Sequence, residues 1–227
     1  MILYDKVTKI YGEGYPAAVE EITLGIDPGE FVSIVGHSGA GKSTLLKMLF
    51  AEVLPTEGSV YFGSHAIASL SQDDLRKLRR KIGTVFQDFR LLPMKTIYEN
   101  IAFALEVAGK TDEDIAADVP HVLDLVGLPD KMWSFPGQLS GGEQQRIAIA
   151  RAIVNQPDVL IADEPTGNLD PVNTRDVVEI LKKINDLGTT VLLATHNKSV
   201  VDSVGRRVVT MDQGRIVRDD KMGKYIL

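Results

Sequence analysis

The sequence contains no cysteine, which excludes a disulfide scaffold, a cysteine zinc site and a thiol nucleophile. No apolar run approaches the roughly 18 residues needed to span a bilayer, and the polar N-terminal stretch is unlike a secretory signal. The 25 basic residues are fewer than the 31 acidic ones, and the net charge of −6 argues against broad nucleic-acid binding. We therefore expect a soluble, cytoplasmic chain that binds no nucleic acid and reaches a membrane only through a partner.

Strand and helix patterns alternate along the 227 residues, and the composition (44% hydrophobic, 25% charged) is ordinary for a globular protein. The N-terminal third has mainly strand patterns, and residues 88–157 are mainly helical. Strand patterns return at 159–162 and 190–194 and in a closing hairpin at 208–217. Pro120 interrupts one helical pattern, so we expect a kink or a new helix start there. These patterns predict an α/β core with an inserted helical subdomain.

A glycine-rich segment joins the apolar strand pattern 31–35 to a helical pattern. It fits G-x-x-x-x-G-K-[ST] in the strand-to-helix context that this motif requires, which disfavours an ordinary glycine-rich turn. Glycines let successive backbone N–H groups point into one concavity, and the helix N-terminus adds positive potential for phosphate. Lys42 can contact the β- and γ-phosphates, and the Ser43 hydroxyl can ligate Mg²⁺. The expected phosphate-binding residues are Gly36, His37, Ser38, Gly39, Ala40, Gly41, Lys42, Ser43 and Thr44.

Two acidic residues follow the apolar run 159–162, where ligands of open α/β sheets gather. We expect Asp163 to hold Mg²⁺ through water, because this ion gives up its hydration reluctantly. The adjacent Glu164 diverges from it and is suited to orient or deprotonate an attacking water. The alternative, two acids that end a strand in solvent, is disfavoured by the buried run that precedes them.

Ser140 opens the segment LSGGEQQ ahead of a helical pattern. Ser140 and Glu143 fit the S-x-x-E capping box of a helix start. Gly141 and Gly142 are adjacent in the first turn, where each costs about 1 kcal/mol relative to alanine. We expect that cost to be offset by an anion that closely approaches their bare backbone N–H groups.

Together these segments resemble the ATP-binding-cassette (ABC) family over nearly the whole chain, since LSGGEQQ is similar to the family's LSGGQ signature. The resemblance implies a P-loop NTPase with a mixed-sheet core and an antiparallel N-terminal β subdomain. It further implies one ATP-binding domain over 1–227, with the RecA-like core and β subdomain at about 1–87 and 158–227 and the helical subdomain at about 88–157. ATP and Mg²⁺ are the implied cofactors, and hydrolysis of ATP to ADP and phosphate is the implied activity.

The same resemblance implies roles for four more residues. Gln87 matches the Q-loop glutamine that reaches the metal and the attacking water, and His196 matches the H-loop histidine. Asp170 matches the D-loop, and Tyr11 fits the aromatic residue that stacks on adenine. The implied catalytic residues are Glu164, His196 and Gln87, and the implied metal ligands are Ser43, Gln87 and Asp163.

Family resemblance also implies a homodimer in which two copies pair head to tail. Each ATP would lie between the P-loop of one copy and the signature residues of the other, in a twofold-symmetric interface. The residues expected to act in trans are Ser140, Gly141, Gly142 and Glu143. ATP would then hold the two copies together, and its hydrolysis would release them.

Within the family, segments 36–47, 86–93 and 162–170 look most like the cell-division ATPases. Those act with FtsX, an integral membrane protein, so we expect an FtsX-like partner at the inner face of the membrane and control of cell-wall hydrolases. Lipoprotein-release and MacB-like export ATPases share ADEPTGNLD and are an alternative. A soluble DNA-associated ABC ATPase is an alternative of a different class, disfavoured because the chain has no heptads and no cysteine.

Two surface features have competing interpretations. The partner's coupling helix is expected near the Q-loop, although Leu91 and Leu92 fit buried core equally well. The basic run 76–81 is expected to complement the dipole of its own helix rather than to bind a membrane or nucleic acid. The residues expected to border the docking cleft are Phe89, Arg90, Leu91, Leu92 and Tyr98.

Overall fold

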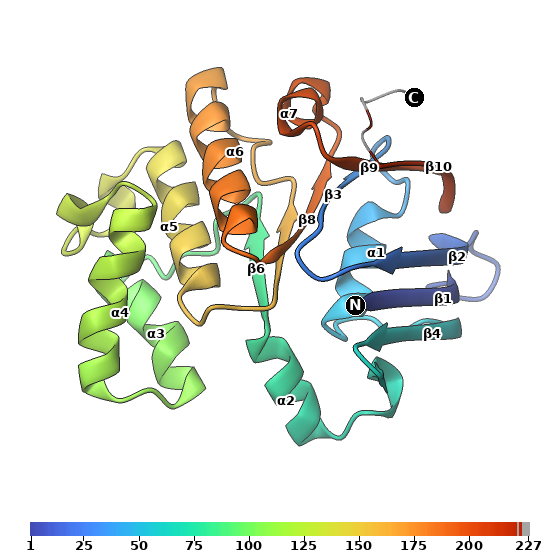
Figure 1. Cartoon of the computed structure of the whole chain (residues 1–227), viewed down its shortest axis with the longest axis horizontal. Coiled ribbons are helices and arrows are strands. Elements are labelled where there is room, and N and C mark those ends of the chain that lie inside the picture. The colour runs from blue at the N-terminus through green and yellow to red at the C-terminus, as the bar shows by residue number, and fades with distance from the viewer. Residues whose placement is uncertain (222, 224–227) are drawn as a thin grey trace.

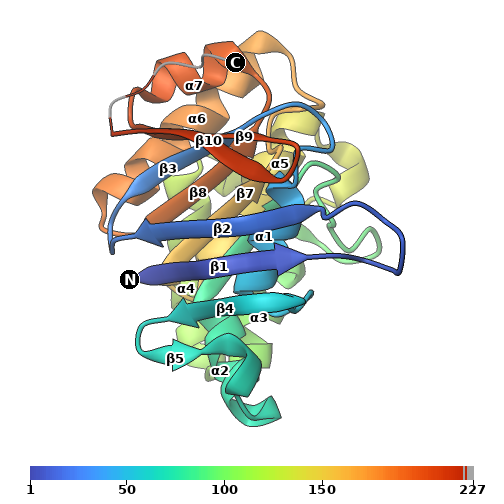
Figure 2. The same cartoon turned by 90° about the vertical axis from the view of Figure 1, so that its right-hand side faces the viewer.

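Two β-sheets pack on either side of helix α1 (Lys42–Leu49), as Figures 1 and 2 show. The computed structural model describes residues 1–221 and 223. An antiparallel sheet has the strand order β2 (Val19–Ile26), β1 (Ile2–Lys9), β4 (Glu57–Phe62) and β5 (His65–Ala66). A mixed sheet has the order β10 (Arg215–Asp220), β9 (Arg207–Asp212), β3 (Phe31–Val35), β8 (Thr190–Thr195), β7 (Val159–Asp163) and β6 (Ile82–Phe86).

The strands of the mixed sheet run parallel except for β10, and their carboxyl ends meet at one edge. Every residue of β3 and β8 is buried, which explains their mostly apolar sequences. The register places Phe86 opposite Asp163, and Asp163 opposite Ala194. Residues that directly follow these strands are therefore neighbours in space although they lie far apart in the sequence.

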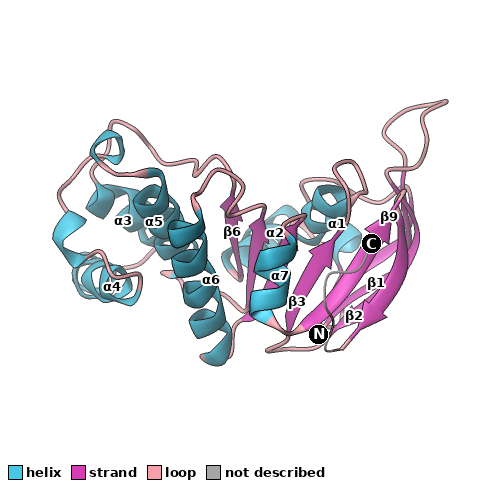
Figure 3. Ribbon diagram, turned by 90° about the horizontal axis from the view of Figure 1, so that it is seen from above, coloured by secondary structure: helices cyan, strands magenta, loops and turns pink. Residues whose placement is uncertain are grey.

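Helices cover both faces of the parallel strands. Helices α6 and α7 pack on one face, and α1 packs on the other together with the antiparallel sheet. Helices α3, α4 and α5 form a layer at one end of the molecule (Figure 3). The remaining bounds are α2 (Gln72–Arg80), α3 (Ile97–Ala108), α4 (Asp112–Leu125), α5 (Gly141–Ile153), α6 (Pro171–Asp186) and α7 (Lys198–Val204), with short 3-10 helices at Ile67–Ser69, Pro129–Lys131 and Pro136–Gln138.

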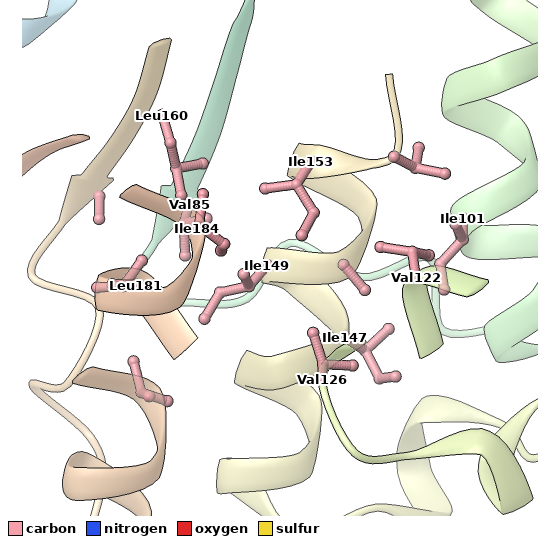
Figure 4. Close-up of a cluster of buried hydrophobic side chains, with 14 of the residues drawn as sticks. Val85, Ile101, Val122, Val126, Ile147, Ile149, Ile153, Leu160, Leu181 and Ile184 are labelled. Atoms are coloured by element: carbon pink, nitrogen blue, oxygen red, sulfur yellow. The ribbon is translucent and has the colours of Figure 1, made fainter. Parts of the chain in front are cut away.

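One hydrophobic core joins the helical layer to the mixed sheet (Figure 4). Ile101 and Val122 bring α3 and α4 against Ile147 of α5, and Ile149 continues the contact toward Leu160 of β7. Helix α5 is thus buried between the other helices and the sheet. Among the described residues, no helix combines the length and the hydropathy needed to cross a bilayer. The arrangement confirms the expected fold class of a mixed-sheet core, an antiparallel sheet and an inserted helical part.

Residues 112–125 form one helix through Pro120, so the expected new helix start at that residue is wrong. Thr111 caps the helix, and Val119, Val122 and Leu123 are buried in the core. Burial of each such side chain contributes about 1.5–3 kcal/mol. Their sum exceeds the roughly 3 kcal/mol cost of an interior proline. Tertiary packing therefore overrides the local signal.

Replacing Pro120 with alanine should raise the free energy of unfolding by about 1–2 kcal/mol, because it restores one backbone N–H donor inside α4. Urea denaturation followed by circular dichroism measures the change. Pro171→Ala is the matched control, since Pro171 lies at the first position of α6, where no intrahelical N–H bond is lost. Equal effects of the two substitutions would contradict this explanation.

The basic run at the end of α2 contacts nearby backbone carbonyls. Arg79 donates to the carbonyls of Phe50 and Ala51, just past α1, and Arg80 donates to the carbonyl of Val107 in α3. Acidic residues occupy the first turn of α2, and Arg76 pairs with Asp73 there. These contacts support the expected structural role of the run.

Candidate active site

A cavity of about 580 Å³ lies where the carboxyl ends of the parallel strands meet. It gathers the loop after β3, the residue after β6, the residue after β8 and Glu164 after β7. The structure thereby brings together most of the residues expected to bind phosphate and to act in hydrolysis. The lining residues are Ala18, His37, Ser38, Gly39, Gly41, Lys42, Ser43, Thr44, Gln87, Glu164 and His196.

The loop after β3 curls tightly around this cavity, and two of its glycines are required for that path. Gly41 has a φ of 99°, and a Cβ there would lie 2.4 Å from the carbonyl oxygen of Ala18. Gly36 has a φ of 151°, and a Cβ there would lie 2.3 Å from the carbonyl oxygen of Met211. No side chain caps the N-terminus of α1, so its first N–H groups are available to an anion.

Lys42 is buried and folded back onto the loop that precedes it. Its Nζ donates to the carbonyls of Gly36 at 2.8 Å and His37 at 3.0 Å, and it lies 3.9 Å from Glu164 Oε1. An ammonium group held by neutral carbonyls and one carboxylate can exchange them for a more highly charged phosphate. This position fits the role expected for Lys42.

Ser43 and Asp163 are joined by a hydrogen bond beside the cavity. Ser43 Oγ donates to Asp163 Oδ1 at 3.1 Å. Burial raises the pKa of Asp163, and the hydrogen bond from Ser43 offsets part of that rise. A poorly solvated carboxylate next to a hydroxyl suits a hard cation such as Mg²⁺. The described residues contain no cluster of three His, Cys, Asp or Glu side chains that could hold a metal alone, so phosphate oxygens and water would complete the coordination.

Replacing Asp163 with asparagine should raise the melting temperature of the nucleotide-free chain, because it removes a charge that burial disfavours while an oxygen remains to accept from Ser43. ATP with Mg²⁺ should raise the melting temperature of the parent chain more than ATP with EDTA does. The same variant should lose this difference. Thermal melts of the chain alone, with ATP and EDTA, and with ATP and Mg²⁺ measure both effects. A lower melting temperature of the nucleotide-free variant would contradict the first expectation.

Glu164 turns away from the line of β7 and contacts His196. Its φ is 50°, a left-handed conformation that is uncommon for this residue type and re-aims the side chain at the strand end. Its N–H donates to the carbonyl of Ala194, and its Oε1 lies 2.8 Å from His196 Nδ1. The carboxylate is mostly buried and the imidazole is exposed. This dyad can orient a water molecule and hold a proton.

Gln87 is held by the segment that follows Glu164. Its Nε2 donates to Asn168 Oδ1 at 3.0 Å, and Asn168 Nδ2 donates to the carbonyl of Gln87 at 3.2 Å. Gly167 leaves room for this contact, since a Cβ there would lie 2.8 Å from Gln87 Nε2. The sequence interpretation assigned the D-loop match to Asp170 and did not identify this contact between Asn168 and Gln87.

The Q-loop beyond Gln87 is held by a residue that the sequence interpretation did not select. Phe89 and Arg90 have φ values of 57° and 49° in succession. Arg151 of α5 donates to the carbonyls of both residues, at 3.1 Å and 2.8 Å. Burial of Arg151 lowers its pKa. Nothing in the sequence around Arg151 indicates that its side chain bonds the backbone of a distant loop.

Tyr11 lies beside the P-loop helix with an exposed ring. Its hydroxyl and Thr44 Oγ1 are 3.2 Å apart, and Lys9 Nζ lies 5.4 Å from the ring centroid. The aromatic face is thus placed near the phosphate loop without lining the cavity itself. This position is compatible with the expected stacking on adenine.

The signature residues lie outside the cavity of their own chain. Ser140 and Glu143 form the predicted capping box, in which each side chain accepts from the backbone N–H of the other. The N–H of Ser140 and then Lys131 lower the pKa of Glu143 to about 2. The stabilisation from this ionised cap is therefore present above the usual value of 4.5 and is lost as the pH falls from about 4.5 to about 2.

The two signature glycines have different surroundings. A Cβ on Gly142 would lie 1.9 Å from Asn173 Oδ1 of α6, whereas the nearest atom to a Cβ on Gly141 is 3.7 Å away. The contact with Asn173 thus gives a steric reason for Gly142, and the approach of an anion to the two glycines stays a prediction. Asp170 caps α6 by accepting from Val172 and Asn173, which fixes Asn173 against Gly142.

Comparison with known proteins gives consistent matches. A profile of the ABC transporter family matches residues 19–167. The cell division ATP-binding protein FtsE of Mycobacterium tuberculosis is 52% identical over 99% of this chain and 98% of its own length, and that of Bacillus subtilis has the same values. FtsE of Escherichia coli is 44% identical over 95% of this chain and 97% of its own.

Solved structures agree with these matches. A dimeric bacterial ABC transporter cassette has a TM-score of 0.89 and 39% identity, covering 99% of this chain and all of that one. A dimeric post-hydrolysis state of an ATP-binding cassette with ADP and phosphate has a TM-score of 0.88 and 38% identity, with the same coverage. Both neighbours are dimers, and one holds the products of ATP hydrolysis.

Proposed function

This chain belongs to the ABC transporter family as an ATP-binding and ATP-hydrolysing cassette, and on that premise we propose that it is the ATPase subunit of a cell-division complex with an FtsX-like integral membrane protein. The observation that carries the proposal is 44–52% identity, over nearly the whole chain, to FtsE proteins of several bacteria. The complex would transmit ATP-driven motion to cell-wall hydrolases outside the membrane. The chain itself would lie in the cytoplasm against the inner face of that membrane.

In the proposed reaction, the P-loop backbone cradles the phosphates of ATP, and Lys42 moves from its loop carbonyls to the β- and γ-phosphates. Ser43, Asp163 and Gln87 are the candidate Mg²⁺ ligands. The bound ion would neutralise charge on the transferring phosphate. The residues proposed to bind ATP are Tyr11 and Gly36, His37, Ser38, Gly39, Ala40, Gly41, Lys42, Ser43 and Thr44.

Glu164 is proposed to orient the attacking water and to accept its proton. His196 would hold the Glu164 carboxylate through its 2.8 Å contact and so keep it aimed at the γ-phosphate. Lys42, 3.9 Å from Glu164, places a positive charge beside the dyad. The reaction proposed for this site is in-line attack of water on the γ-phosphate, with ADP as the leaving group.

The proposed active form is a head-to-tail homodimer. Two solved neighbours that cover this chain almost completely are dimers, which supports pairing. The signature residues lie outside the cavity of their own chain, which supports a role in the partner's site. The residues proposed to complete that site in trans are Ser140, Gly141, Gly142 and Glu143, with Asp170 in the adjacent D-loop.

The membrane partner is proposed to dock at a groove of about 470 Å³ beside the Q-loop. The groove runs between α2, β6, α3 and α5 and combines arginines with exposed Phe103 and Val107. Of the residues expected at the cleft, Arg90 lines this groove, while Leu91 and Tyr98 pack against the core. Leu92 is partly exposed, at 37%. The core interpretation thus fits Leu91, and the docking proposal moves toward Arg90 and Phe103.

Co-purification tests the proposed partner. The tagged chain and the FtsX-type protein of the same organism are co-expressed, the membranes are solubilised, and ATPase activity of the complex in nanodiscs is compared with that of the chain alone. We expect a stable complex, and cells depleted of the chain should fail to separate. Failure to associate, with normal separation of depleted cells, would contradict the proposal. Association instead with a lipoprotein-release or MacB-like permease would favour that export role.

A further inference from the structure

The segment between Glu164 and α6 contains an asparagine whose side chain bonds Gln87 twice. Gln87 Nε2 donates to Asn168 Oδ1 at 3.0 Å, and Asn168 Nδ2 donates to the backbone carbonyl of Gln87 at 3.2 Å. Gln87 lines the nucleotide cavity, together with Ser43 and Glu164. The two bonds therefore act on a side chain that faces the reacting groups.

The chemistry of the two bonds fixes how both amides are turned. A backbone carbonyl can only accept, so it selects the NH₂ group of Asn168. Asn168 then presents its oxygen to the Gln87 side chain, and that oxygen can only accept as well. Gln87 must therefore turn its NH₂ group toward Asn168 and keep Oε1 for another partner. The backbone carbonyl of Gln87 therefore determines the orientation of both side-chain amides.

We propose that Asn168 is a positioning residue that sets the orientation of the Gln87 amide, so that its oxygen is the atom offered to the metal ion. This inference rests on the proposed function, in which Gln87 is a ligand of Mg²⁺. Only the amide oxygen can coordinate a cation, because the NH₂ group has no lone pair available. An amide turned the other way would present hydrogens to the ion.

The backbone around Asn168 is itself held rigidly. The N–H of Gly167 donates to the carbonyl of Glu164, and the N–H of Leu169 donates to that of Thr166, which is buried. Asp170 then caps α6. Gly167 leaves room for the Gln87 side chain. A Cβ at position 167 would lie only 2.8 Å from Gln87 Nε2 and would push that side chain away. These hydrogen bonds tie the turn that carries Asn168 to Glu164, directly after β7.

The expected effect follows from the population of the competent orientation. A free amide in two equal orientations would bind the ion about twofold more weakly, since the apparent dissociation constant rises as the competent fraction falls. Loss of the hydrogen bond to Asn168 also lets the Gln87 side chain sample more rotamers, which weakens binding of the ion beyond twofold. We expect Asn168→Leu to weaken binding of the ion about three- to tenfold.

The test uses Mn²⁺ as the probe of the cation site. Mn²⁺ is titrated into the full chain saturated with a non-hydrolysable ATP analogue, and free Mn²⁺ is read from its EPR signal. Asn168→Leu should raise the dissociation constant three- to tenfold relative to the parent. Asn155→Leu is the matched control, because Asn155 also donates to a backbone carbonyl, that of Ala104, but lies outside this cavity. It should leave the constant unchanged.

Gln87→Glu separates orientation from general structural support. A carboxylate has two equivalent oxygens and no N–H to donate to Asn168 Oδ1, so Asn168→Leu should not weaken Mn²⁺ binding in that background. Equal weakening in both backgrounds, or no weakening in the parent background, would overturn the inference. Nucleotide binding in EDTA is measured separately with a fluorescent ATP analogue. Failure of the parent chain to bind nucleotide would instead refute the proposed function.

Discussion

Replacing Glu164 with glutamine should slow ATP hydrolysis by about 10²- to 10⁴-fold and leave ATP binding intact. Glutamine has nearly the same shape and can still contact His196 Nδ1, which lies 2.8 Å from the present Oε1. It cannot accept a proton from water, so the loss falls on the chemical step. The contacts proposed for phosphate, made by Lys42 and the P-loop backbone, do not involve this side chain except for the 3.9 Å approach of Lys42.

The variant should also accumulate as a dimer with Mg²⁺ and ATP, because the γ-phosphate that joins the two copies is no longer removed. Single-turnover phosphate release measures the chemistry, and light scattering after size exclusion measures the dimer. Glu179→Gln is the control, since Glu179 is an exposed glutamate on α6 that pairs with Lys182. Hydrolysis at the parent rate would remove Glu164 from the proposed role. A variant that stays monomeric with Mg²⁺ and ATP, with and without the membrane partner, would refute the proposed composite site.

The parts of the fold predicted from sequence are those with a strong local signal. Strands buried on both faces are mostly apolar in sequence, and β3 and β8 are such strands. The helix start with a capping box at Ser140 and Glu143 was also recognisable. The new helix start expected at Pro120 is wrong because the local cost of this proline is smaller than the gain from burial of the neighbouring valines and leucine in the core.

Contacts between distant segments could not be predicted from one sequence. The bonds from Arg151 to the carbonyls of Phe89 and Arg90 join residues about sixty positions apart, and nothing in their local sequence marks the pairing. The same holds for Asn168 and Gln87. Such pairs depend on the parallel register that brings the strand ends together. The sequence indicated which chemical groups were present, and the fold determines which of them touch.

These contacts connect the signature helix to the Q-loop within one chain. Besides Arg151, α5 supplies Gln145, which is fully buried and donates to the carbonyl of Phe86 at 3.3 Å. Two side chains of one helix therefore bond the backbone on both sides of Gln87. A displacement of the Q-loop by a docked partner would be transmitted to the helix that begins with the signature. Through these hydrogen bonds, the proposed docking of a membrane partner beside Gln87 could affect α5 and the signature residues at its start.

The two signature glycines should respond differently to alanine. Gly142→Ala should lower the free energy of unfolding by about 1–3 kcal/mol, because the new Cβ would overlap Asn173, whose Oδ1 lies 1.9 Å away and whose Cβ lies 2.7 Å away. Gly141→Ala should leave stability unchanged or slightly higher, since its nearest neighbour is 3.7 Å away and alanine favours the helix. Thermal melts of the nucleotide-free chain measure both changes, at roughly 2–4 °C per kcal/mol.

A second substitution isolates the cause of that difference. Asn173→Gly removes the three atoms that would lie nearest to a methyl group on Gly142, at a cost of about 1 kcal/mol for a helical glycine. In this background Gly142→Ala should no longer destabilise the chain. Both alanine variants should still weaken ATP-dependent pairing, because a methyl group at either position would obstruct a phosphate that approaches from the partner. If Gly142→Ala destabilises the chain equally with and without Asn173, the contact between α5 and α6 is not the reason for this glycine. If either variant pairs normally in ATP, the signature backbone does not contact the partner's nucleotide.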